Sequence, residues 1–201
     1  MRLDWHLDGS YEDVYEDVGG VEILREAVAE AVAVLPREHL RQLEAFLMWD
    51  EDPKGKALGI WRQDHTGVAV ELYLRPHIMP LLPLPVRVRV FALRLHLAYT
   101  IFHEVGHHVT RFLNRRATPP RKAAQVEQKI ERWADDYAEK RLGRLVERWL
   151  VPGGRADSAD DRRALSTALR SLRLDTLVTL PDAEGAGKEA AGGTKEAAPA
   201  S

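Results

Sequence analysis

The sequence contains no cysteine, and this absence excludes several kinds of chemistry. Disulfide frameworks, thiol nucleophiles, iron–sulfur clusters and cysteine-ligated zinc fingers all need a side chain that these 201 residues do not supply. Any transition-metal site must therefore use imidazole and carboxylate groups. The chain has eight histidines, and three of them fall within six residues, at positions 103, 107 and 108.

Long apolar runs are also missing. No stretch approaches the roughly 18 apolar residues that a membrane-spanning helix needs, and residues 78–86, the longest run of low charge near the middle, contain three prolines. The N-terminus, MRLDWHLDGS, lacks the apolar region of a secretory signal. We therefore expect no membrane partner and a cytoplasmic location.

The net charge is small, −2, which argues against a general polyanion binder. The charge is nevertheless uneven, because residues 1–35 sum to −7 and residues 86–122 sum to +7. We expect these segments to face each other or water. The alternative is that the basic segment binds an acidic partner such as nucleic acid, which the overall balance makes the weaker hypothesis.

Composition close to the globular average, with 45% hydrophobic and 30% charged residues, predicts one folded domain. We expect an acidic N-terminal segment (1–20), a single domain (21–180, core 57–150) and a disordered tail (181–201) poor in large apolar side chains. The periodicity predicts helices over residues 21–35, from 36 to about 47, about 87–113, 126–149 and 158–174. Two extended runs, 57–62 and 68–74, predict a hairpin, and the prolines between 76 and 85 should break regular structure. The fold class expected is α+β, with helices packed on a small antiparallel sheet.

The segment His103-Glu104-Val105-Gly106-His107 is an HExxH motif inside the longest predicted helix. Residues four apart lie on one face of a helix, so the two imidazoles can bind one metal ion. Glu104, which follows the first histidine, is placed to act as general base on a water molecule. The alternative is a solvated helix face without a metal. Gly106 favours the metal site, because glycine costs a helix about 1 kcal/mol and its presence indicates that another backbone comes close.

A catalytic zinc site needs a third protein ligand and an open fourth position. The downstream helix offers four acids, Glu127, Glu131, Asp135 and Asp136. Glu131 shares a helix face with two alanines, at positions 134 and 138, which leaves room for another helix. We therefore predict Glu131 as the third ligand, with Glu127 as the alternative. Asp135 could hydrogen-bond a ligand histidine.

These two motifs resemble the zincin metallopeptidases of the glutamate-ligand type. Within that group, HEVGH followed 24 residues later by ERWADDYA at residues 131–138 resembles the ImmA/IrrE-like minimal peptidases, whose second motif is roughly E-x-x-A-x-x-F-A. Tyr137 stands where that motif has phenylalanine, and the spacing of Glu131 and Asp135 also suits the thermolysin-like pattern. The resemblance covers about residues 57–142. It implies a zincin-like fold with HExxH on a central helix, and an edge strand at Val68–Leu74 that pairs with a peptide substrate.

The function expected is zinc-dependent hydrolysis of peptide bonds, with Zn²⁺ on His103, His107 and Glu131. The alternative is a binding or regulatory protein on the same scaffold, with a structural or masked zinc. The residue that stabilises the oxyanion stays open, and the candidates are His108, Tyr137, Tyr99, His96 and Arg111.

Overall fold

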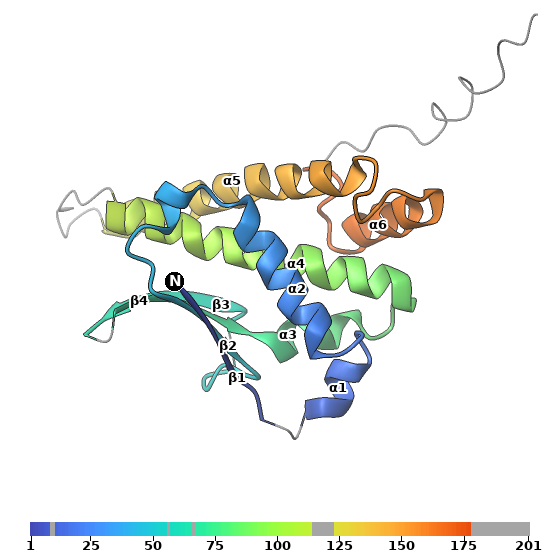
Figure 1. Ribbon diagram of the computed structural model, residues 1–201. Helices are drawn as coiled ribbons and strands as arrows, with labels where there is room; N and C mark the ends of the chain where they lie inside the picture. Colours follow the sequence, from blue (N-terminus) through green and yellow to red (C-terminus); the bar gives the residue numbers. More distant parts are fainter. Residues whose placement is uncertain (9–10, 56, 66, 114–122, 178–201) are drawn as a thin grey trace, which may run out of the picture.

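The computed structural model describes residues 1–8, 11–55, 57–65, 67–113 and 123–177 (Figure 1). Within these residues the protein is α+β, which confirms the expected fold class. The predicted disordered tail, 181–201, lies outside the described residues.

The sheet has four strands in the order β1-β2-β4-β3. Their bounds are Arg2–His6 (β1), Ala45–Trp49 (β2), Gly59–Asp64 (β3) and Gly67–Tyr73 (β4). Strands β3 and β4 form the predicted antiparallel hairpin, but β1 pairs with β2 and β2 with β4 in parallel. The expectation of an antiparallel sheet was therefore wrong for two of three pairings. Parallel neighbours need a crossover connection, and the helical segment between β1 and β2 provides one.

The helices occupy most of the described chain. Those N-terminal to the HExxH motif are α1 (Glu12–Glu16), α2 (Val21–Val34), a 3₁₀ turn (Arg37–Leu40), α3 (Leu74–Ile78) and a second 3₁₀ turn (Met79–Leu81). The motif lies at the end of α4 (Val86–His107), which continues as a π-helical turn (His108–Leu113) and is followed by α5 (Ala123–Leu150) and α6 (Ala159–Ser171). Ser158 caps α6 as its sequence predicts, since its hydroxyl accepts the Asp161 N–H.

The predicted helix beginning at Pro36 is absent. The chain there forms only the 3₁₀ turn, passes through Gln42 with a positive φ of 66°, and enters strand β2. Four of the five residues of β2 are buried, and the strand lies between β1 and β4 in the sheet. A short apolar run of this kind does not distinguish a buried strand from a buried helix by periodicity, and the long-range strand pairing decides between them.

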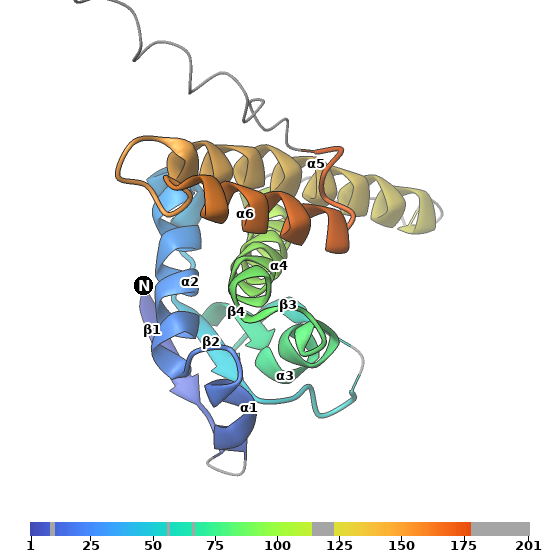
Figure 2. The same cartoon turned by 90° about the vertical axis from the view of Figure 1, so that its right-hand side faces the viewer.

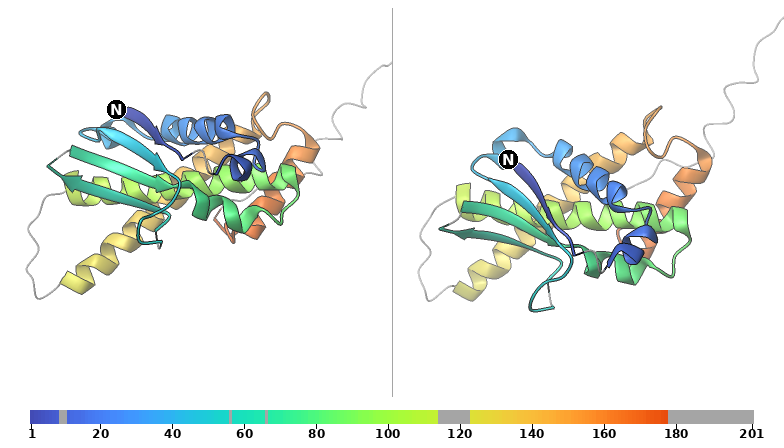
Figure 3. Two further views of the ribbon diagram at one scale, coloured as in Figure 1. Left: turned by 90° about the horizontal axis from the view of Figure 1, so that it is seen from below. Right: turned by 60° about the horizontal axis from the view of Figure 1, so that its bottom comes forward.

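Helix α4 lies at the centre of the molecule. Helices α4, α5 and α6 lie on one side of the sheet (Figure 1), whereas α1 and α3 lie beyond one end of its strands (Figure 3). Helix α4 runs between the sheet and the pair α5 and α6 (Figure 2). Its apolar residues Leu93, Leu97, Ile101 and Val105 are fully buried. A helix surrounded in this way must be apolar on nearly every face. None of the described helices is long and apolar enough to cross a membrane.

The acidic N-terminal segment and the basic middle segment of the sequence meet in the fold. The Arg94 side chain is completely buried on α4 and donates to Glu26 at 2.7 Å and Glu30 at 3.0 Å on α2. Arg89 donates to the carbonyl oxygen of Asp17 at 2.7 Å. The expectation that the acidic and basic segments face each other is thus confirmed for these residues, and this part of the positive charge is used within the fold.

Candidate metal centre

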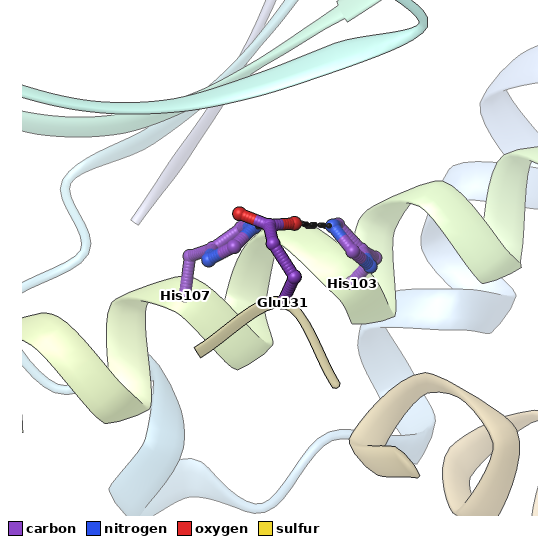
Figure 4. Close-up of side chains that lie close together, drawn as sticks. All are labelled: His103, His107 and Glu131. Carbon is purple, nitrogen blue, oxygen red and sulfur yellow. Dashed lines mark hydrogen bonds and ion pairs between the residues drawn. The ribbon is translucent and has the colours of Figure 1, made fainter. Parts of the chain in front are cut away.

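The side chains of His103, His107 and Glu131 converge at the crossing of α4 and α5 (Figure 4). The two imidazole Nε2 atoms lie 3.0 Å apart, and Glu131 Oε2 lies 3.4 Å from each of them. One ligand atom from each residue thus fits within 4.8 Å of the others. Two imidazole nitrogens and one carboxylate oxygen could hold a divalent transition metal between them.

Small residues bring the two helices together. A Cβ atom at Gly106 would lie 2.9 Å from the Cα and 3.2 Å from the Cβ of Ala134 on α5. Ala134 and Ala138 are both completely buried. The close backbone approach expected from Gly106 is therefore present, and it lies one helical turn from Glu131.

Asp135 orients the first histidine. Its Oδ1 lies 3.0 Å from His103 Nδ1 and accepts a hydrogen bond from the Tyr99 hydroxyl at 3.3 Å. Since a carboxylate only accepts, Nδ1 carries the ring proton and the lone pair of Nε2 points into the converging group. Burial, reinforced by Asp135, raises the pKa of Tyr99 and keeps that hydroxyl a donor.

His107 has no comparable support. Its Nδ1 is buried and has no hydrogen-bond partner among the described residues. Burial lowers the pKa of His107, which favours the neutral ring that a metal ion requires.

Glu104 is held beside the metal group by main chain from the sheet. The residue is 8% exposed, and its Oε2 accepts the N–H of Trp61 on β3 at 2.6 Å. Burial raises the pKa of Glu104, while the hydrogen bond from the Trp61 N–H acts in the opposite direction. A carboxylate with a raised pKa is a better proton acceptor near neutral pH. Gly59 permits this approach, because a Cβ there would lie 2.6 Å from Thr100 Cγ2.

The remaining predicted residues lie apart from the three converging side chains. His108 is completely buried and bonds to the Arg41 carbonyl oxygen and the Trp61 indole. Tyr137 is buried with its hydroxyl 2.7 Å from His39 Nδ1. Neither interaction points toward the metal group, which agrees with a structural role for both side chains.

Three further candidates also lie outside the group. Glu127, the alternative ligand, pairs with Arg111 at the surface. Arg111 itself lies over the Trp61 ring, 5.9 Å from its centroid. His96 packs edge-on against His77 with ring centroids 4.5 Å apart.

A cavity of about 570 Å³ opens beside the converging residues. Its lining includes His103, Glu104 and Asp135. The other lining residues are mostly apolar and come from the start of β3 and the residue before it, from α4 and from the segment after α6, namely Leu58, Gly59, His96, Tyr99, Thr100, Leu172 and Leu174. The sequence did not predict that Gly59, Leu172 and Leu174 line this cavity, or that Trp61 bonds to Glu104.

The strand expected to bind substrate is not at the edge of the sheet. Val68–Leu74 falls mainly on β4, which pairs with β2 on one side and β3 on the other. This expectation was wrong, because strand order in the sheet does not follow order in the chain. No described strand pairs with the outer side of β3. The main-chain groups of Gly59, Trp61 and Gln63 face outward there, as the Trp61 N–H bond to Glu104 shows.

Comparisons with protein-family models, curated proteins and solved structures gave no match. The resemblance to glutamate-ligand zincins therefore stays a prediction from the motifs.

Gly106→Ala tests the helix crossing. Alanine is the better helix former by about 1 kcal/mol, but here its methyl group meets the α5 backbone. We expect a net loss of about 1–3 kcal/mol in the free energy of unfolding, measured by urea denaturation. Gly143→Ala on α5 is the matched control, because a Cβ there meets nothing within 4 Å. That variant should be as stable as the native protein or more so, and a Gly106→Ala protein of undiminished stability would contradict the close crossing.

Three acid-to-alanine variants rank the ligands by zinc affinity, measured by competition with a chromophoric chelator. Asp135→Ala should weaken binding about 10- to 100-fold, because it removes only the hydrogen bond to His103. Glu131→Ala should weaken it more, and Glu127→Ala should leave it unchanged. If Glu127→Ala has the largest effect, the third ligand has been wrongly assigned.

Proposed function

We propose that the protein is a zinc-dependent metallopeptidase. The observation that carries the proposal is the meeting of three ligand atoms from His103, His107 and Glu131, with the buried Glu104 carboxylate next to them on α4. The HExxH spacing and the downstream acid support the same reaction class, as does the resemblance to glutamate-ligand zincins.

The residues fit zinc better than a hard cation. Two neutral imidazoles and one carboxylate are the protein ligands of catalytic zinc sites, whereas magnesium and calcium prefer oxygen ligands. A zinc ion held by these residues would polarise the substrate carbonyl and lower the pKa of a bound water molecule.

Glu104 carries the proton in this proposal. Its Oε2 is engaged by the Trp61 N–H, so Oε1 is the oxygen available to a water molecule. The carboxylate takes a proton from the attacking water and delivers it to the amide nitrogen as the peptide bond breaks. Desolvation of the carboxyl group brings its pKa closer to neutrality, which suits both steps.

The substrate fits as an extended peptide beside β3. The outward main-chain groups of Gly59 and Gln63 can pair with a peptide backbone, and the cavity next to Glu104 can accept a side chain. Three leucines, at positions 58, 172 and 174, line that cavity. We therefore infer that the enzyme prefers a large apolar side chain next to the bond that it cleaves.

Glu104→Gln separates catalysis from metal binding. Glutamine keeps the shape and can still accept the Trp61 N–H, but it cannot take a proton. We expect unchanged zinc content by metal analysis and a rate of peptide cleavage about 10²- to 10⁴-fold lower on a mixed peptide library. Cleavage at the native rate would rule out Glu104 as the base.

The same peptide library distinguishes a peptidase from the alternative, a binding or regulatory protein. A native protein that binds zinc tightly and cleaves no peptide would favour a binding or regulatory protein with a structural or masked zinc. Cleavage beside small or charged residues only would refute the inferred preference for large apolar side chains while leaving the peptidase assignment intact.

A further inference from the structure

His108, which directly follows the HExxH motif, links three separate parts of the chain. Its Nε2 lies 2.9 Å from the carbonyl oxygen of Arg41, and its Nδ1 lies 3.2 Å from the indole Nε1 of Trp61. A carbonyl oxygen can only accept and an indole N–H can only donate. The ring is therefore neutral with its proton on Nε2, and the two partners fix both its tautomer and its orientation.

Trp61 connects His108 to the site through two hydrogen bonds. Its indole is held by His108, while its main-chain N–H donates to Glu104 Oε2 at 2.6 Å. The same residue thus joins Glu104 on α4 and His108, the first residue of the π-helical turn, to the outer strand of the sheet. The strand also lies close to α4 at Gly59, where a Cβ would be 3.3 Å from Glu104 Cγ.

The His108 ring does not belong to the reacting group. It is 0% exposed, and it lies on the Trp61 side of α4 rather than with the converging atoms of His103, His107 and Glu131. Its hydrogen-bonding capacity is used entirely by Arg41 and Trp61. Of its two hydrogen bonds, the one to Trp61 leads to the site through the strand.

We propose that His108 is a positioning residue that fixes the distance between strand β3 and helix α4. The indole bond holds the strand where the Trp61 N–H can keep the Glu104 carboxylate turned toward the water and where the outward groups of Gly59 and Gln63 face a peptide. The effect of the His108–Trp61 hydrogen bond on catalysis rests on the proposed peptidase function. Its effect on the position of β3 does not.

Two substitutions remove the same bond from opposite ends. His108→Phe keeps an aromatic ring without polar atoms, and Trp61→Phe removes the indole N–H but keeps the main-chain N–H. Each should lower kcat on a peptide substrate about three- to tenfold, with less change in KM and with unchanged zinc content. His108→Gln, which offers one donor and one acceptor, should recover part of the loss. The matched control is Trp49→Phe, because the buried Trp49 indole N–H has no partner among the described residues.

The double variant tests whether His108 and Trp61 act through the same hydrogen bond. If both residues act through one bond, His108→Phe combined with Trp61→Phe should lower kcat no further than either change alone. Additive losses would overturn the proposal, as would variants that lower the melting temperature and leave kcat unchanged. If His108→Phe does not fold, the comparison of Trp61→Phe with Trp49→Phe decides in its place.

Amide exchange measured by NMR tests the strand without any reaction. In His108→Phe the main-chain N–H of Trp61 should exchange about three- to tenfold faster than in the native protein, and His108→Gln should restore its protection. If the native protein cleaves nothing, the peptidase function fails and the exchange result still decides the role of His108. Equal exchange in the native protein and His108→Phe would show that His108 does not hold the strand.

Discussion

The crossing of α4 and α5 is the contact on which the candidate site depends. The two histidines of the motif share one face of a helix and cannot by themselves complete a metal site, since the third ligand must come from elsewhere. Glu131 reaches them because Gly106 and Ala134 allow the helix backbones to approach more closely than larger side chains would permit. The helix propensity lost at Gly106 is the local cost of assembling the site.

The part of the site that lies on α4 is largely buried, so its polar groups need hydrogen-bond partners within the fold. Glu104 and His107 are nearly covered, and Arg94, further along α4, is completely covered. The Glu104 carboxylate receives the Trp61 N–H, and Arg94 receives two carboxylates from α2. Partners from the sheet and from α2 thus allow one helix to be both the core of the molecule and the carrier of its chemistry.

The features of the site that follow from local helix geometry could be predicted from the sequence. The positions of His103 and His107 follow from helical spacing alone, and the small residues beside Glu131 distinguished it from the other acids of α5. The sheet was harder to predict from the sequence, because the parallel pairing of Ala45–Trp49 and the outer position of β3 depend on contacts between residues far apart in the chain. The partner of Glu104 was missed for a different reason. It is a main-chain N–H, which every residue except proline carries, so no sequence motif marks it.

The central claim is that His103, His107 and Glu131 bind one zinc ion together. X-ray absorption at the zinc edge of the metal-loaded protein tests it most directly, because it reports the number and type of ligand atoms. The account predicts two imidazole nitrogens at about 2.0–2.1 Å and carboxylate or water oxygen at about 2.0–2.2 Å. A zinc shell with fewer than two imidazoles would contradict it, as would one that keeps the same ligands after His103→Ala.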